Sequence, residues 1–109
     1  MGNKKLIYVC SKYSGDIEKN TQYAMAYCRA IYRCGQIPIA PHLYFTRFLN
    51  DDNQVEREDG LQMGLKLLSM CDEMWVFDGD ISKGMKQEIE FATKHNIPIT
   101  ECIMGRGEE

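Results

Sequence analysis

Short apolar runs alternate along this chain with longer segments of helical periodicity. The runs 6–10 and 73–78 are rich in β-favouring residues and are followed by polar or small residues, a pattern typical of buried parallel strands. Two shorter runs, 37–40 and 98–100, predict further strands. Pro38 favours an edge position for the first of these, because proline donates no hydrogen bond to a neighbouring strand.

The segments between the runs predict helices. Apolar residues recur at helical spacing from about residue 20 to 34, and Gly35 follows at the position of a C-cap glycine. A second helix is predicted over about 55–70, after a stretch, 41–58, that is the least regular of the chain. Ser82 is the predicted N-cap of a third helix that runs to about residue 95.

The alternation of strands and helices implies right-handed crossovers and a parallel sheet covered on both faces. The chain has 109 residues, of which 44% are hydrophobic and 27% charged, which fits one globular domain spanning residues 1–109. We therefore predict a three-layer α/β domain of the Rossmann-like or flavodoxin-like kind, with a parallel sheet of four to five strands.

Charge and composition narrow the possible partners. The net charge is −3 and the basic residues are scattered, so we expect no nucleic-acid polymer as a partner. No apolar run approaches the roughly 20 residues of a membrane helix, and no signal peptide is recognisable, so we expect a cytoplasmic protein without a membrane partner. The five cysteines include no CxxC pair, which favours reduced, buried thiols over a disulfide framework or a zinc site.

Ligands of open parallel sheets gather beyond the carboxyl ends of the strands. Here those ends lead into three loops, 11–16, 41–53 and 78–82, each rich in polar or small residues. His42 in the second loop is either a ligand contact or a partly exposed polar residue. Asp78 in the third loop is either a site carboxylate or a turn former.

One carboxylate stands out on the third predicted helix. Glu88 shares an i, i+3, i+4, i+7 stripe with Met85, Ile89 and Ala92, which places it on the core-facing side. An ionised carboxylate there is unfavourable unless it is paired or solvated by a cleft. It lies about 9 Å along the helix from the Ser82 cap, and its side chain points back toward the ligand edge. Glu88 is therefore either a reacting group or half of an ion pair at the core margin.

The start of the same helix is a candidate anion site. Ser82 and Gly84 leave backbone N–H groups at the positive end of the helix dipole, where a phosphate or a ribose hydroxyl fits, although serine caps are common without any ligand. The first loop adds hydroxyl groups, a glycine and Lys12. Neither the P-loop spacing nor a GxGxxG fingerprint is present.

Four segments carry a wider pattern that covers about residues 5–100. They are Ile7-Tyr-Val-Cys with Ser11-Lys-Tyr-Ser-Gly-Asp16, Ile37-Pro-Ile-Ala-Pro-His42, Cys71-Asp-Glu-Met-Trp-Val-Phe, and Ser82-Lys-Gly-Met-Lys-Gln-Glu-Ile-Glu-Phe-Ala92. Together they resemble the nucleoside deoxyribosyltransferase-like superfamily, and most of all its small bacterial and phage domains. The last segment is similar to the superfamily's Ser/Asp-x-Gly-x-x-x-Glu-x-x-x-Ala helix, whose nucleophilic glutamate falls on Glu88.

The resemblance implies a reaction at the N-glycosidic bond of a nucleoside or nucleotide, without a cofactor or metal. Glu88 would attack the anomeric carbon, and the resulting ester would be resolved by a second base or by water, as in retaining glycosidases. Tyr8 would orient the nucleophile, Asp78 would contact the base or assist its departure, and Ser82 and Gly84 would hold a phosphate or the 5′ end. The other implied substrate contacts are Ser11, Tyr13, Gly15, Asp16, His42 and Met85.

Two places depart from the superfamily pattern. Met85 replaces the usual threonine after the helix glycine, and Lys12 and Tyr13 replace a compact glycine-rich turn. These departures favour the alternative function, a non-catalytic module that binds or sequesters a nucleotide. Because members of the superfamily commonly form dimers or tetramers, the resemblance also implies a homo-oligomer. The aromatic segment 43–45 serves such an interface or packs in the core.

Overall fold

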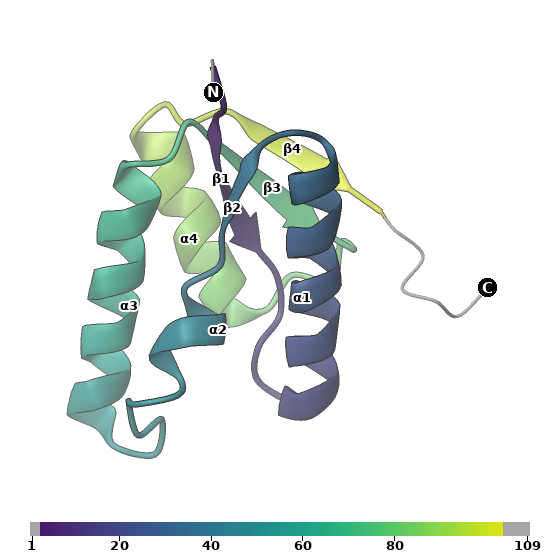
Figure 1. Ribbon diagram of the computed structural model, residues 1–109. Helices are drawn as coiled ribbons and strands as arrows, with labels where there is room; N and C mark the ends of the chain where they lie inside the picture. Colours follow the sequence, from purple (N-terminus) through teal and green to yellow (C-terminus); the bar gives the residue numbers. More distant parts are fainter. Residues whose placement is uncertain (1–2, 104–109) are drawn as a thin grey trace.

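Four parallel strands form the centre of the protein, in the order β2-β1-β3-β4. The computed structural model describes residues 3–103 and places this sheet between layers of helices (Figure 1). The strands are β1 (Leu6–Cys10), β2 (Ile37–Ile39), β3 (Glu73–Phe77) and β4 (Ile99–Cys102). Because β1 pairs with both β2 and β3, the chain reverses its winding direction at β1, as in flavodoxin-like folds. β2 lies at an edge, as Pro38 predicts.

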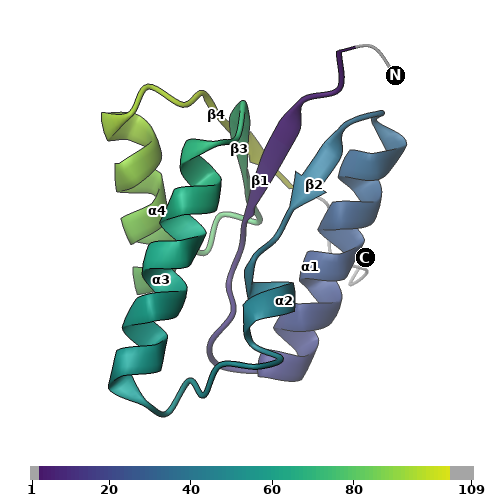
Figure 2. The same ribbon diagram turned by 60° about the vertical axis from the view of Figure 1, so that its left-hand side comes forward.

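Helices cover both faces of this sheet. They are α1 (Ile17–Arg33), α2 (His42–Phe45), α3 (Gln54–Ser69) and α4 (Lys83–Lys94). α1 packs on one face, while α3 and α4 lie side by side on the other (Figure 2). The predicted three-layer α/β domain is therefore confirmed. Within residues 3–103, no helix combines the length and the apolar character needed to cross a membrane.

The alternation of side chains along the strands divides the core into two halves. The half under α3 and α4 contains Tyr8, Cys10, Leu68, Met74, Val76, Met85 and Ala92. The half under α1 contains Ile7, Val9, Tyr27, Ile31 and Phe77. Successive residues of β1 belong to opposite halves because their side chains point to opposite faces of the sheet. Tyr8 thereby brings a hydroxyl group into the half under α3 and α4.

Several boundaries differ from those that periodicity predicts. α1 begins at Ile17 and not near residue 20, because the Asp16 carboxylate accepts a hydrogen bond from the Lys19 N–H at 3.2 Å and caps the helix. The single turn α2 lies within the segment that lacks periodicity. β4 begins after Pro98 and continues to Cys102, because its pairing with β3 extends that far.

The five cysteines occupy different environments. Cys10 and Cys71 are buried, Cys28 and Cys102 are half-buried, and Cys34 is exposed. The prediction of uniformly buried thiols is therefore wrong for Cys34. This residue is the C-cap of α1, after which the chain turns into β2.

Buried Asn20 fixes the loop that follows β1. Its side chain is on α1, and Nδ2 donates hydrogen bonds to the carbonyl oxygens of Tyr13 at 3.2 Å and Ser14 at 3.0 Å. Asn20 is 6% exposed, so these bonds are shielded from solvent. The loop therefore has a defined conformation, and Tyr13 is held beyond the carboxyl end of β1.

Asn20→Ala should lower the free energy of unfolding by about 1–2 kcal/mol, because two loop carbonyls lose a shielded donor. Urea unfolding followed by the fluorescence of Trp75 measures the change. Gln22→Ala on the exposed face of the same helix is the matched control and should change stability by less than about 0.5 kcal/mol. Equal losses in the two variants would contradict the role of Asn20.

Candidate active site

The centre of the candidate site is a hydrogen bond between β1 and α4. The Tyr8 hydroxyl donates to Oε2 of Glu88 at 2.6 Å, and Tyr8 is 1% exposed. Glu88 is half-buried and faces a cleft. Within residues 3–103, no lysine or arginine forms an ion pair with Glu88. Among these residues, Glu88 is therefore not half of a structural ion pair, which was one of the two alternatives that the sequence left open.

Burial changes the protonation of this pair. It raises the pKa of the Glu88 carboxyl to about 7, against the opposing effect of hydrogen bonds from Tyr8 and Cys10. Burial and the nearby Glu88 carboxylate raise the pKa of Tyr8, so its hydroxyl stays protonated and remains a donor. A carboxyl group that titrates near neutral pH beside a fixed donor is common in catalytic sites.

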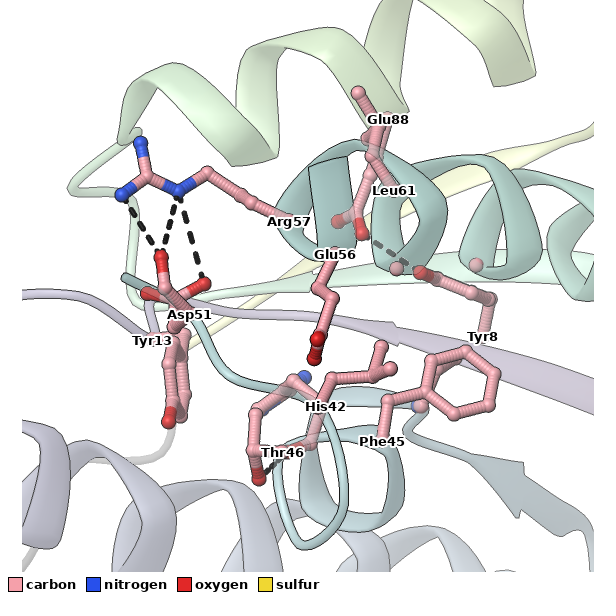
Figure 3. A pocket seen from close by; sticks show the side chains of 14 residues that line it. Tyr8, Tyr13, His42, Phe45, Thr46, Asp51, Glu56, Arg57, Leu61 and Glu88 are labelled. Atoms are coloured by element: carbon pink, nitrogen blue, oxygen red, sulfur yellow. Dashed lines mark hydrogen bonds and ion pairs between the residues drawn. The ribbon is translucent and has the colours of Figure 1, made fainter. Parts of the chain in front are cut away.

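The cleft beside Glu88 has two connected parts. They share six lining residues: Tyr13, His42, Asp51, Arg57, Leu61 and Glu88. The part between α2 and α3, here the α3 pocket, has a volume of about 150 Å³ (Figure 3). Its apolar wall consists of Phe45, Leu49, Gly60, Leu61 and Gly64. The part along the start of α4, here the α4 groove, has a volume of about 560 Å³. Ser11, Ser14, Ser82, Lys83, Gly84 and Met85 line it.

Ser82 and Met85 cap each other at the start of α4. Ser82 Oγ accepts a hydrogen bond from the Met85 N–H at 3.3 Å, and Met85 Sδ accepts one from the Ser82 N–H at 3.5 Å. The Met85 side chain is 2% exposed and anchors this turn in the core. The reciprocal cap therefore fixes the start of the helix, and with it the position of Glu88 less than two turns later.

His42 enters the cleft at the start of α2. Burial lowers the pKa of its imidazole to about 4, so the ring is neutral at pH 7. Its Nε2 lies 3.5 Å from Ser11 Oγ, and its ring centroid lies 5.9 Å from that of Tyr13. A neutral imidazole held in this way offers a ligand one hydrogen-bond donor or acceptor. His42 is thus placed to contact a ligand.

Asp78 lies in a different polar cluster, on the α1 side of the sheet. Its carboxylate accepts a hydrogen bond from the Tyr27 hydroxyl, and it borders a small depression together with Lys12 and Asp80. Asp78 lines neither the α3 pocket nor the α4 groove. The structure therefore does not bring Asp78 together with Glu88, contrary to the expectation of a base contact. The residue has a φ of 64°, and this left-handed conformation turns the chain as it leaves β3.

The remaining residues singled out from the sequence divide between the cleft and its supports. Those that line the cleft are Ser11, Tyr13, His42, Ser82, Gly84 and Met85. Gly15 and Asp16 do not line it. Gly15 turns the first loop with a φ of 97°, and Asp16 caps α1. These two residues shape the loop that carries Tyr13.

Three charged residues at the mouth of the cleft were not expected. Arg57 donates to the Asp51 carbonyl through Nε at 3.1 Å and Nη2 at 2.9 Å, and its Nε lies 3.8 Å from Asp51 Oδ1 (Figure 3). Glu56 accepts a hydrogen bond from the Asn50 N–H at 2.6 Å. The sequence shows here only a polar turn followed by the charged first turn of a helix, which is a common surface pattern.

The aromatic segment 43–45 divides between the cleft and the surface. Phe45 lines the α3 pocket, whereas Tyr44 is 64% exposed. The Tyr44 ring centroid lies 5.5 Å from that of Phe48, which is also exposed. The segment therefore does not belong wholly to the core. Its role in an interface between copies of the chain, and the homo-oligomer itself, stay predictions.

Comparisons with known proteins agree with this architecture. A family model described as a domain of unknown function (DUF7768) matches residues 5–102. A 2-deoxyribosyltransferase from the psychrotolerant bacterium Bacillus psychrosaccharolyticus has a similar structure, with a TM-score of 0.73 and 13% sequence identity over 90% of this chain and 72% of that chain. At this identity the similarity shows a shared fold. A search of curated proteins found no match.

Glu88→Gln should stabilise the protein at pH 8 but not at pH 4.5. Because burial raises the pKa of Glu88 from its ordinary value of 4.5 to about 7, the folded state binds the proton more tightly than the unfolded state. The contribution of this group to stability is thus complete below pH 4.5 and is lost as the pH rises through 7, by up to about 3 kcal/mol. Urea unfolding at the two pH values measures the difference between the variants, and a difference independent of pH would contradict burial of the carboxyl group.

Proposed function

The chain belongs to the DUF7768 family, and we propose that this member cleaves the N-glycosidic bond of a nucleoside, with Glu88 as the nucleophile. The observation that carries the proposal is the Tyr8–Glu88 hydrogen bond beside a cleft at the carboxyl ends of the strands. The fold shared with a 2-deoxyribosyltransferase and the resemblance of segment 82–92 to a nucleophile-bearing helix support the same reaction class.

Glu88 reacts in its ionised form, as a carboxylate nucleophile. Tyr8 contacts Oε2, so Oε1 is the oxygen that bonds to the anomeric carbon. As this bond forms, the bond from carbon to the base nitrogen breaks and its electron pair leaves with the base, which takes a proton from water. Water or a second base then attacks the same carbon, gives up its proton to the solvent and releases the Glu88 carboxylate. The hydrogen bond from Tyr8 keeps the carboxylate in one orientation through both steps.

The charges of the cleft favour an uncharged substrate over a phosphorylated one. Four carboxylates line it, those of Asp51, Glu56, Glu58 and Glu88, against two cations, Arg57 and Lys83. Arg57 is already engaged with Asp51. The mutual cap of Ser82 and Met85 also uses two N–H groups at the helix start where a phosphate was expected. We therefore assign the 5′ end of the substrate as a hydroxyl.

Wild-type protein incubated with a panel of nucleosides and nucleotides should release free base, detected by chromatography. Glu88→Gln and Glu88→Ala should reduce the rate by at least about a thousandfold, because the covalent step loses its nucleophile. Glu90→Gln, an exposed carboxylate on the same helix, is the matched control and should retain the wild-type rate.

Base release that persists in both Glu88 variants would overturn the assignment of the nucleophile. A second outcome is tight retention of a nucleoside without release, with similar affinity in Glu88→Gln. That outcome would support the alternative function, a non-catalytic binding module, which Met85 in place of a hydroxyl residue favours.

The pH dependence of base release should report the ionisation of Glu88. We expect kcat/KM to rise with pH through about 7 and then level off, because only the carboxylate reacts. Tyr8→Phe removes a donor that lowers the pKa of Glu88, so the midpoint should move to higher pH and the rate at pH 7 should fall by about tenfold or more. An unchanged midpoint in Tyr8→Phe would show that Tyr8 does not act on Glu88.

A further inference from the structure

Two glycines stand one helical turn apart on the wall of the α3 pocket. Gly60 and Gly64 lie in the interior of α3, where glycine is less favourable than alanine. The backbone does not require glycine at either position, because the positive φ values are at Gly15, Gly35 and Gly79. The explanation must therefore lie in the space that the two residues leave open.

The contacts of Gly64 show that this space belongs to the pocket. A Cβ atom added there would lie 3.5 Å from the Tyr8 hydroxyl, an ordinary van der Waals contact. Alanine at position 64 is thus compatible with the fold but places a methyl group beside the Tyr8–Glu88 pair. At Gly60 a Cβ would approach Leu49 Cδ1 to 3.2 Å, which requires Leu49 to shift. Gly64 is therefore the cleaner position for testing the pocket.

The size and lining of the α3 pocket suit one planar ring. Its volume of about 150 Å³ equals that of a closed apolar cavity that accommodates benzene, although this pocket opens into the α4 groove. Phe45, Leu49 and Leu61 supply apolar contacts, while polar groups of His42 and Glu56 also border the space. Figure 3 shows the Glu56 carboxylate directed toward the side of the pocket where His42 and Thr46 lie. A neutral imidazole and a carboxylate together can pair with the N–H groups on the edge of a heterocycle.

The position of Glu88 sets the direction of the substrate. The α4 groove begins at the capped turn around Ser82, and Glu88 follows about 9 Å further along α4, where groove and pocket meet. With the anomeric carbon at Glu88, a sugar in the groove directs its base into the α3 pocket.

We infer that the α3 pocket is the subsite of the leaving base and that, with Gly64 as its size-determining residue, it selects a single-ring pyrimidine over a purine. The inference rests on the proposed function for the identity of the ligand. A purine adds a second ring in the same space and brings it against the Phe45 and Leu49 side chains. A methyl group at position 64 removes room that the single ring needs, and such a change in a binding pocket alters discrimination by about 10–200-fold.

The test compares wild type, Gly64→Ala and the control Asp59→Ala. Asp59 is exposed on α3 and lines neither part of the cleft, so its replacement raises helix propensity without filling the pocket. Isothermal titration with free uracil, thymine and cytosine, and with adenine and hypoxanthine, measures binding independently of turnover. Base release from the corresponding nucleosides gives kcat and KM.

Wild type should bind the pyrimidines and should cleave their nucleosides with a kcat/KM at least tenfold above that of the purine nucleosides. Gly64→Ala should unfold at the same or a higher temperature, yet bind pyrimidines at least tenfold more weakly and show the loss in KM. Asp59→Ala should match wild type in affinity and KM.

Equal affinity for purines and pyrimidines, no binding of pyrimidines, or wild-type affinity in Gly64→Ala would each overturn the inference. Absence of base release from every nucleoside, with selective pyrimidine binding retained, would instead remove the proposed function and leave the subsite intact. The binding and turnover measurements thus separate the two failures.

Discussion

The hydrogen bond between Tyr8 and Glu88 connects the central strand to the last helix across 80 positions of the sequence. Its geometry depends on two separate parts of the fold. β1 is paired on both sides, which fixes the Tyr8 ring in the core. The Ser82–Met85 cap fixes the start of α4 and therefore the height of Glu88 above the sheet. Because packing holds both residues, the Tyr8–Glu88 pair is preorganised. The cleft lies beside this pair.

The same arrangement is unfavourable for stability. Burial opposes the ionised form of Glu88, as its pKa of about 7 shows, and a hydroxyl donor offsets this only in part. A glutamine at the same position keeps an acceptor for Tyr8 without the charge. The carboxylate therefore has no structural advantage at neutral pH. Such a residue, kept where a neutral one fits better, is expected at a reacting centre, where stability and activity conflict.

Periodicity and composition were sufficient for the fold and for placing Glu88 on the core-facing side of its helix, but not for the other contacts of the candidate site. The four strands and three long helices follow from local patterns, and Glu88 was recognisable because a carboxylate interrupted an apolar stripe. Arg57 and Glu56 could not be recognised, because their contacts depend on how α3 packs beside α2. The sequence pattern predicts the wrong side of the sheet for the Asp78 carboxylate, and the reason is the conformation of its backbone. Alternation along β3 puts Val76 on the Glu88 side and would put Asp78 there too, but its left-handed φ turns the carboxylate toward Tyr27.

The unfavourable local features of the α3 and α4 side converge on one small volume. Glu88 is a half-buried carboxyl group, Tyr8 is a fully buried hydroxyl on the central strand, and Gly64 is a glycine in a helix interior. Each departs from what its own element prefers, and each departs for a different reason: charge, polarity and lost helix propensity. The side chains of Glu88 and Tyr8 line the α3 pocket, and so does Gly64, which has no side chain. Local exceptions that arise independently would be scattered over the molecule, whereas the proposed ligand site predicts that they meet, as they do around about 150 Å³.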